Sequence, residues 1–394
     1  MLHMTKEAKF EVVTIKRCYG ASDYIKFFSL HSPSFNHSVL ATSRILNYDV
    51  YRGSCCGSLR FSSTLRSIGK SDSVLLKPWF ITGFCDAEAC FNLTVKNSKS
   101  TKTGWHVIPL FQIGLHMKDI ELLKQIQAFF ESGLEGSLGS IRKVGVIRIS
   151  GKMAYYSVSS AKELTKIIEH FDNYPLLTKK RLDFHIWKEA LINLSRKEHL
   201  TAEGLRAIVL LKAALNQGLS ENLQTAFQVT STEVEKGFLN KATAYLCNNV
   251  LPFHPQWLAG FTSGDGNFAV GLHSNSVRLG LTPRLLFQLT QHSRDEELLI
   301  RLCTWLGCGT VRKVSQSSVV IFSVQKFAEN ESKIIPLFRE NLIQGVKAYD
   351  FNDWCSVAEI IRSKGHLTKA GLDQIVELKA GMNKYRVNVA SDTE

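Results

Sequence analysis

Two stretches of the chain repeat the same order of apolar and polar segments. Each begins with a short apolar run after a proline, Pro78 in the first stretch and Pro255 in the second. Proline is favoured in the first turn of a helix, where its missing N–H would have no helical partner. Each run therefore predicts a short buried helix, which ends near Ala89 in the first stretch and near Gly266 in the second.

Further β-like and helical segments follow each predicted helix. The first stretch contains FNLTV, HVIPLFQIGL, VGVIRIS and AYYSVS, and the second contains FAVGL, RLLFQLT, GTVRKV and SVVIFSV. Ser160 with Glu163, and Ser293 with Glu296, have the spacing of a capping box before helical segments. The order αββαββα therefore occurs twice, which predicts an α+β fold with two antiparallel sheets.

Four pairs of matching segments occur in the same order in the two stretches. PWFITGFCDAEACF matches PQWLAGFTSGDGNF, and LFQIGLHMKDIELL matches LFQLTQHSRDEELL, with Asp119 on Asp295. KRLDFHIW matches KAYDFNDW, and HLTAEGL matches HLTKAGL. Because chance similarity would rarely preserve this order, we interpret the chain as a duplicated domain. We predict repeats at 77–217 and 253–390, joined by a linker at 218–252.

Residues 1–76 belong to neither repeat, and we predict that they form an N-terminal extension. Between residues 14 and 70 the chain is rich in Ser and Arg and contains only two acids, Asp23 and Asp49. This composition fits an organellar transit segment. It fits a flexible leader read through from flanking sequence equally well, so both interpretations stay open.

Charge and cysteine content narrow the class of protein. The 394 residues include 48 Lys and Arg against 35 Asp and Glu, a net charge of +13. This excess fits a basic protein without a special partner, and it also fits one that binds nucleic acid. No apolar run approaches the ~18 residues of a membrane-spanning helix, so we expect no membrane partner. The nine scattered cysteines argue against a disulfide framework or a zinc site, and they indicate a reducing compartment.

The segment FCDAEACF contains two acids, Asp86 and Glu88, in an otherwise apolar run. Buried charges are costly unless something pairs with them, so an acid in this run needs a partner or a function. The repeat aligns Asp86 with Ser263 and Glu88 with Asp265, so only the second acid is kept as an acid. This selects Glu88 and Asp265, and it predicts that Asp86 is a solvated or local capping group.

Small residues recur at helical i, i+4 spacing before each selected acid. They are Gly83 with Ala87, and Gly260 with Gly264. Side chains of this size let two helix backbones approach closely. If the two helices pack, their C-terminal ends bring the acids together, where the helix dipoles add negative charge. A hard divalent cation such as Mg²⁺ suits that site, and with a basic surface it suggests metal-assisted phosphodiester hydrolysis.

The segments ITGFCDAEA and LAGFTSGDG resemble the two motifs of single-chain LAGLIDADG homing endonucleases encoded in fungal mitochondrial introns. The resemblance extends over about residues 77–390, including the FQ..LH.KD segment and the HLT..GL helix. It implies a monomeric mitochondrial protein with pseudo-twofold symmetry and motif helices at the repeat interface. Two saddle-shaped antiparallel sheets would then lie along the major groove of double-stranded DNA.

The resemblance also implies an activity and a set of site residues. The family cuts both DNA strands across the minor groove and leaves short 3′ overhangs. Glu88 and Asp265 would bind two or three Mg²⁺ ions beside the scissile phosphates, with help from the backbone carbonyls of Ala87 and Gly264. Lys180, Lys347 and Gln291 would assist catalysis, where Gln291 positions the attacking water and its counterpart Leu115 cannot.

Two positions depart from the family pattern. Ala89 stands where the family usually has glycine, at a point where the chain leaves the helix. We expect a positive φ there, which alanine resists by about 1 kcal/mol or more. In addition, Asp265 is one methylene shorter than Glu88, so the two metal positions need not be equivalent and the strands could be cut at different rates.

Alternation along the predicted strands gives candidate DNA contacts, because every second residue faces the same side. Arg can bind guanine through two hydrogen bonds, whereas Lys more often meets phosphate. Because the two repeats differ at these positions, we expect an asymmetric target whose central base pairs are read through deformability. The candidates are Asn92, Thr94, Lys96, Arg142, Lys143, Arg148, Arg278, Arg284, Arg312 and Lys313.

Three functions remain in competition at this point. The first is a site-specific DNA endonuclease, which the two acids favour. The second is an RNA maturase that assists splicing of its host intron, with or without cleavage, and the departure at Ala89 leaves room for it. The third is a silent DNA-binding regulator on the same fold, which the paired acids disfavour.

Overall fold

The computed structural model describes residues 13–15, 25–27, 75–132, 143–215, 218–230, 250–274, 280–383 and 386. The chain divides into two compact units, 1–71 and 72–394. In the first unit, strands β1 (Val13–Ile15) and β2 (Ile25–Phe27) pair antiparallel. Most of the predicted N-terminal extension lies outside the described residues, and its role as a transit segment or leader is still a prediction.

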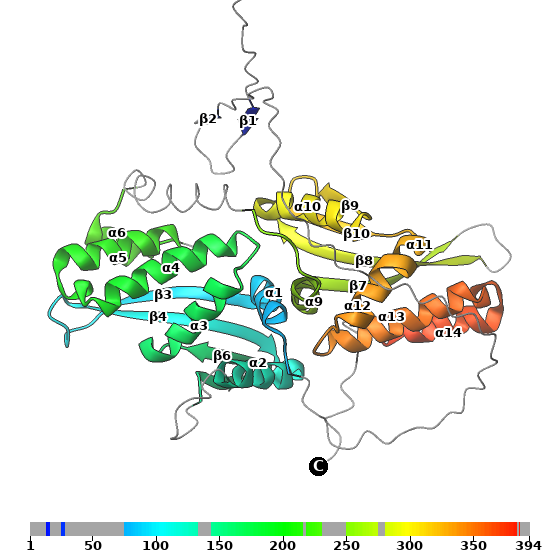
Figure 1. Ribbon diagram of the computed structural model, residues 1–394, viewed down its shortest axis with the longest axis horizontal. Coiled ribbons are helices and arrows are strands. Elements are labelled where there is room, and N and C mark those ends of the chain that lie inside the picture. Colours follow the sequence, from blue (N-terminus) through cyan, green and yellow to red (C-terminus); the bar gives the residue numbers. More distant parts are fainter. Residues whose placement is uncertain are drawn as a thin grey trace, which may run out of the picture. The chain divides into compact units, whose positions relative to one another are not determined.

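The second unit contains both predicted repeats, and the first repeat together with the start of the predicted linker runs from α1 to α6 (Figure 1). Its motif segment is a helix that begins at Pro78, as predicted. Its elements are α1 (Pro78–Glu88), β3 (Ala89–Asn97), β4 (Trp105–His116), η1 (Met117–Asp119), α2 (Ile120–Ser132), β5 (Val146–Ser150), β6 (Met153–Val158), α3 (Ala161–Asn173), α4 (Lys180–Ser195), η2 (Glu198–Leu200), α5 (Ala202–Ala214) and α6 (Glu221–Phe227).

The second repeat follows the same order of elements. They are α9 (Pro255–Asp265), β7 (Gly266–Ser274), β8 (Leu281–His292), η4 (Ser293–Asp295), α10 (Glu296–Leu306), β9 (Thr310–Lys313), β10 (Val319–Val324), α11 (Phe327–Glu329), the π turn η5 (Asn330–Ile334), α12 (Ile335–Glu340), α13 (Lys347–Arg362), η6 (Gly365–Leu367) and α14 (Lys369–Ala380). The antiparallel sheets have the equivalent orders β3-β4-β6-β5 and β7-β8-β10-β9. The predicted α+β fold with two repeats is therefore confirmed. Beyond the order αββαββα, the first repeat also contains α4 and α5, and the second contains α13 and α14.

Helices α3 and α10 begin where the sequence predicts, but the two capping boxes are wrong. Ser160 makes no side-chain cap bond, and the Glu163 carboxylate instead accepts the Gly145 amide at 2.9 Å. Ser293 lies inside the 3₁₀ turn η4, where the His292 ring caps the turn. Because a single turn precedes α10, its capping spacing cannot be read from the chain alone.

Each sheet buries one face under an aromatic cluster. Phe91 lies within 5.5 Å of the rings of Phe111, Phe171, Phe184 and Trp187, measured between ring centroids. The second repeat has an equivalent cluster around Phe268, whose neighbours are Phe287, Phe338, Phe351 and Trp354. Because alternate residues bury this inner face, the opposite face of each sheet is left for other contacts.

The two motif helices pack against each other between the sheets (Figure 1). A Cβ atom built at Gly83 would overlap the Trp257 carbonyl, and one built at Gly260 would overlap the Phe80 carbonyl. The helices therefore touch through their backbones at both glycines. Any side chain at these positions would push them apart.

Asp86 is a buried structural group, so its assignment as a solvated or local capping residue is wrong. Its side chain accepts hydrogen bonds from the Leu177 amide at 2.8 Å, the Thr178 amide at 3.2 Å and the Thr178 hydroxyl at 2.6 Å. It also accepts the Trp257 indole N–H at 2.7 Å. All four partners are donors, which suits an ionised carboxylate and ties α1 to α9 and to the turn before α4.

The expected positive φ at the exit from the motif helix is also wrong. Ala89 has φ −80° and Gly266 has φ −75°, and both are extended. Glycine is instead suited to Gly266 because a Cβ there would overlap the branched methyl group of Thr262. Cys85 stands in place of Thr262 in the first repeat and has no branched Cβ, so alanine fits there.

Helix α6 lies within the segment predicted as a linker. Its Leu223 is buried with Val95, Val107 and Leu205 of the first repeat, and the Phe227 ring lies 5.2 Å from that of Trp105. The first part of the segment therefore packs on the first repeat, while the boundaries 77–217, 218–252 and 253–390 stay predictions. Among the described residues, no helix is both long and apolar enough to cross a membrane.

We expect Gly260→Ala to destabilise the protein by about 1–3 kcal/mol, the usual cost of overpacking a tight contact. The added methyl group meets a backbone carbonyl that can move only if α1 moves with it. Chemical denaturation followed by circular dichroism measures the change. Gly271→Ala is the control, because the nearest atom there belongs to the His273 ring at 3.0 Å, which can rotate away. An equal effect of both changes would contradict the proposed backbone contact.

Candidate active site

Glu88 and Asp265 are the last residues of α1 and α9. Because these helices are packed together, both carboxylates lie at the same end of the helix pair. Glu88 Oε1 is 3.2 Å from the position that a Cβ at Gly264 would occupy, so its side chain reaches across to the opposite motif. Both acids are half-buried. The structure thus brings together the two acids that the repeat selects.

The electrostatics of this acid pair favour a positive partner. Burial raises the pKa of Glu88, and the nearby charge of Asp265 raises it further, while Lys347 and Lys180 act in the opposite direction. Burial also raises the pKa of Asp265, opposed by a hydrogen bond from Gln291 and by the same two lysines. Two half-buried carboxylates that repel each other are costly to ionise, and a cation between them would relieve that cost.

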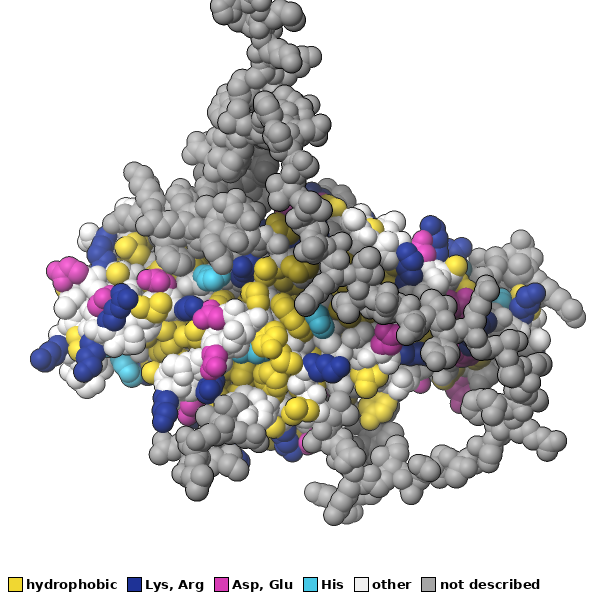
Figure 2. Space-filling model, in the orientation of Figure 1, with side chains coloured by type: hydrophobic (Ala, Val, Ile, Leu, Met, Phe, Trp, Pro, Cys, Tyr) yellow, Lys and Arg dark blue, Asp and Glu magenta, His cyan; other side chains and the backbone are white. Residues whose placement is uncertain are grey.

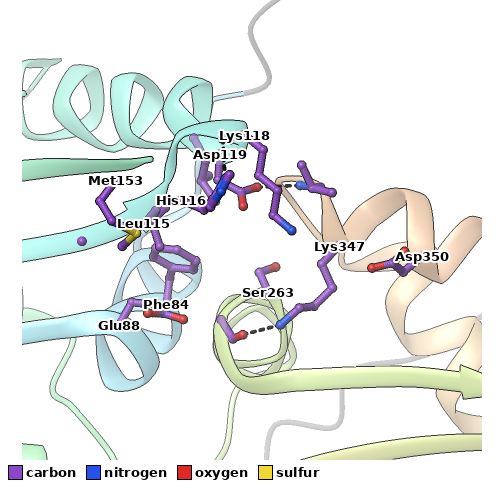
Figure 3. Close-up of a pocket in the computed structure, with 14 residues that line it drawn as sticks. Phe84, Glu88, Leu115, His116, Lys118, Asp119, Met153, Ser263, Lys347 and Asp350 are labelled. Carbon is purple, nitrogen blue, oxygen red and sulfur yellow. Dashed lines mark hydrogen bonds between the residues drawn. The ribbon is translucent and has the colours of Figure 1, made fainter. Parts of the chain in front are cut away.

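In each repeat, one lysine contacts the backbone carbonyl just before the acid. Lys180 Nζ donates to the carbonyls of Ala87 at 3.0 Å and Cys85 at 3.1 Å, and Lys347 Nζ donates to the Gly264 carbonyl (Figure 3). The repeat alignment makes Ala87 equivalent to Gly264. Both lysines open a helix, α4 or α13, so equivalent elements carry them to equivalent carbonyls.

Gln291 is the polar residue at the end of β8 that distinguishes the two halves. Its amide donates to Asp265 Oδ2 at 2.5 Å. The residue at the equivalent place in β4 is Leu115, whose side chain has no hydrogen-bonding group. Asp265 therefore has an amide partner that the first repeat cannot offer to Glu88 in the same way.

A cavity of about 350 Å³ opens beside the acid pair, between β4 and η1 of one repeat and α9 and α13 of the other (Figure 3). Charged groups from both repeats line it, so it belongs to neither half alone. The ionisable side chains in its wall are Glu88, His116, Lys118, Asp119, Lys347 and Asp350.

Most described candidates for DNA contact share the outer face of their sheet. Asn92, Thr94 and Lys96 alternate with the buried residues of β3. Arg148, Arg284 and Arg312 are exposed and lie on β5, β8 and β9 respectively. These side chains point away from the aromatic cores.

Four further candidates are placed differently. Lys143 precedes β5 and lies outside the strand. Lys313 pairs in register with the buried Val320, so it lies on the helix-covered side of the sheet, and it forms an ion pair with Glu296 at 2.7 Å. Arg142 and Arg278 lie outside the described residues.

Sequence reasoning missed two glutamines at equivalent places on the outer faces. Gln112 on β4 donates to the Ser157 hydroxyl at 3.0 Å, and Gln288 on β8 lies 3.5 Å from the Asn267 amide nitrogen. The signal was present, because both occur in the matched LFQ segments and alternate with buried residues. Glutamine amides can read adenine in the major groove.

The basic charge does not form one continuous patch on the face shown in Figure 2. Lys and Arg side chains there are interspersed with Asp and Glu. The net charge of +13 is therefore a property of the whole chain, and it does not by itself mark a binding surface on this face.

Comparison with known sequences identifies relatives over most of the folded region. A family model described as LAGLIDADG endonuclease matches residues 81–191 and 258–358. The chain is 35% identical over 315 residues to "Probable intron-encoded endonuclease 3" of Neurospora crassa, which covers 80% of this chain and 54% of that protein. The chain therefore spans about half the length of this relative.

Solved structures with the same fold were determined with DNA. The chain resembles the LAGLIDADG homing endonuclease I-SmaMI bound to cleaved DNA, with a TM-score of 0.71 and 40% identity over 79% of this chain and 98% of that one. It also resembles the LAGLIDADG homing endonuclease I-GzeII in complex with its DNA target, with a TM-score of 0.68 and 36% identity over 79% of this chain and 100% of that one. The resemblance drawn from the two motifs is confirmed.

We expect Glu88→Gln to stabilise the metal-free protein at neutral pH by about 1 kcal/mol, as is common when a strained functional group is neutralised. Because the pKa of Glu88 is raised on folding, its ionisation costs stability above that pKa, and the cost disappears as the pH falls through it. The gain should therefore vanish in acid. Urea denaturation across pH measures it, with Glu121→Gln as an exposed control. A loss of stability at neutral pH would contradict the electrostatic account.

Proposed function

Because the chain belongs to the LAGLIDADG endonuclease family, we propose that it is a sequence-specific endonuclease that hydrolyses both strands of double-stranded DNA and leaves 3′ overhangs. One observation carries the proposal. Glu88 and Asp265 end two packed helices, and the carbonyl before each acid accepts a lysine ammonium group. Such a pair of equivalent half-sites fits two phosphodiester bonds, one on each strand.

The residues present fit Mg²⁺ or a similar hard cation. The donors are oxygens, and the repulsion between Glu88 and Asp265 falls when a positive charge lies between them. The carbonyls of Ala87 and Gly264 each keep a second lone pair beside the bound lysine. Among the described residues, no three His, Cys, Asp or Glu side chains gather into a cation site, so phosphate and water would complete the shell. A bound cation would polarise the phosphate and stabilise the negative charge that develops on it.

The protein's own side chains would supply the remaining chemistry. Lys180 and Lys347 place positive charge beside the acid pair, where it would offset the charge on the attacked phosphate. The Gln291 amide, held at Asp265, could orient the attacking water in the second half. Because Leu115 offers no such group, the two strands would be cut at different rates.

The outer faces of the two sheets would provide sequence recognition. An antiparallel sheet fits the major groove, where each base pair presents a distinct pattern. Asn92 and Thr94 in the first sheet align with Ala269 and Gly271 in the second, and Arg284 in the second sheet aligns with Ile108 in the first. A long asymmetric target follows from this difference.

A single chain supplies both halves of the site, so we propose that the protein acts as a monomer. Its fungal relatives are described as intron-encoded, one of them in an intron of the ND4 gene, which supports a mitochondrial location. An RNA maturase that aids splicing of the host intron is the function to test if cleavage is absent, because the same basic fold could contact RNA.

We expect the double variant Glu88→Gln with Asp265→Asn to lose cleavage by at least about 10³-fold, because several kcal/mol of charge stabilisation disappear with the cation. DNA affinity should stay within about threefold, since the outer sheet faces are unchanged. The measurement is cleavage of a randomised duplex library with Mg²⁺, followed by sequencing of the ends and by gel-shift assays in EDTA.

Matched controls separate the nuclease from its alternatives. Glu121→Gln with Glu297→Gln changes two exposed acids at equivalent places outside the site, and it should leave cleavage intact. If the unaltered protein cuts no duplex with Mg²⁺, Mn²⁺ or Ca²⁺, the endonuclease proposal is wrong. Intron splicing with and without the double variant would then test the maturase.

A further inference from the structure

Two acids outside the motif helices make reciprocal contacts across the repeat boundary. Asp119 in η1 of the first repeat accepts the Val346 amide of the second repeat at 2.7 Å (Figure 3). Asp295 in η4 of the second repeat accepts the Lys179 amide of the first repeat at 2.6 Å. The repeat alignment makes these two acids equivalent. Each therefore binds the same point on the other half.

Each of these contacts is made by the residue just before Lys347 or Lys180. Val346 is the N-cap residue of α13, whose first residue is Lys347, and Lys179 is the N-cap residue of α4, whose first residue is Lys180. Resting on the function proposed above, we propose that Asp119 and Asp295 are positioning residues. Each carboxylate holds the helix start that carries the catalytic lysine of the opposite repeat.

The helix starts need such a partner. The first amides of a helix have no intrahelical acceptor, and a negative group there also complements the helix dipole. Neither Val346 nor Lys179 has a side-chain cap hydrogen bond of its own. The amides of these two N-cap residues are instead accepted by carboxylates of the other repeat.

Both carboxylates are fitted closely to their places. Asp295 is only 4% exposed, so its bond to the Lys179 amide is shielded from water. Asp119 lies in the cavity wall beside Gly345, which has φ +71°. A Cβ at Gly345 would lie 2.6 Å from Asp119 Oδ1, so the turn before α13 leaves just enough room for the carboxylate.

A second contact holds each turn from its own repeat, and here the halves differ. Asp86 accepts two amides and a hydroxyl from Leu177 and Thr178, before Lys180. Its counterpart Ser263 accepts one amide, from Gln344, at 3.1 Å before Lys347. The Lys347 turn therefore depends more on its cross-repeat acid, and loss of Asp119 should loosen it more than loss of Asp295 loosens the Lys180 turn.

The first test needs no DNA. In Asp119→Ala, amide hydrogen exchange over residues 344–348 should accelerate by about tenfold, the cost of one charge-assisted hydrogen bond, with residues 177–181 unchanged. Asp295→Ala should do the reverse and by a smaller factor. Glu121→Ala and Glu297→Ala, at equivalent exposed places, are the controls. Equal loosening of both turns, or of neither, would overturn the reciprocal assignment.

The second test follows the two DNA strands with separate end labels. Asp119→Ala should slow the same strand or strands as Lys347→Ala by about tenfold, and Asp295→Ala should follow Lys180→Ala. In double variants, Asp119→Ala should not slow cleavage further when Lys347 is already replaced, but its effect should add fully to that of Lys180→Ala. Asp295→Ala should show the reverse pattern. Asp119→Asn and Asp295→Asn keep an acceptor oxygen and should recover most of the rate. These variants also guard against loss of folding.

The outcomes separate the two proposals. If the unaltered protein cuts no duplex, the endonuclease proposal fails, while hydrogen exchange still decides whether each acid holds the opposite helix start. If the protein cuts and each acid variant slows both strands equally whichever lysine is present, the endonuclease proposal stands and the positioning assignment is wrong.

Discussion

The backbone contact between α1 and α9 is the constraint on which the rest of the structure depends. Phe80 and Trp257 carbonyls occupy the space that side chains at Gly260 and Gly83 would need. The helices can therefore pack in few other ways, and the acids that end them are fixed at one point. The two sheets leave these helices directly through β3 and β7, so the same contact sets the spacing between their outer faces. Fold and site depend on one interface.

Duplication supplies the geometry of the site, and departures from it distinguish the halves. Equivalent lysines reach equivalent carbonyls, and equivalent acids hold the lysine-bearing helices. Against this symmetry, Gln291 has an amide where Leu115 has only an apolar side chain, and Asp86 has a carboxyl group where Ser263 has a hydroxyl. The first difference lies at an acid and bears on chemistry. The second lies under a turn and bears on how firmly a lysine is held.

The element order and the choice of acids could be predicted because the first repeat can be aligned with the second. Strand alternation also placed Arg148 and Arg312 on outer faces. What failed depends on contacts between distant segments. The sequence does not reveal that Asp86 is a buried group, because its partners Leu177 and Trp257 lie 91 and 171 residues away along the chain. The fit of alanine at Ala89 depends instead on a local contact, because Cys85, one turn earlier, has no branched side chain like that of Thr262. Lys313 lies on the helix-covered side of the sheet for a simpler reason, because adjacent residues of a strand face opposite sides and Arg312 faces outward.

Asp119 and Asp295 show how such distant contacts change the meaning of the duplication. Their match was visible in the sequence, but spacing along one chain does not reveal which turn a carboxylate meets. In the fold, the amide of the residue before each lysine, Lys179 or Val346, is accepted by a carboxylate of the other repeat. Neither half-site is then complete within a single repeat. A displacement of one repeat would withdraw an acid from the opposite lysine, so the two half-sites are coupled by the same interface that joins their carboxylates.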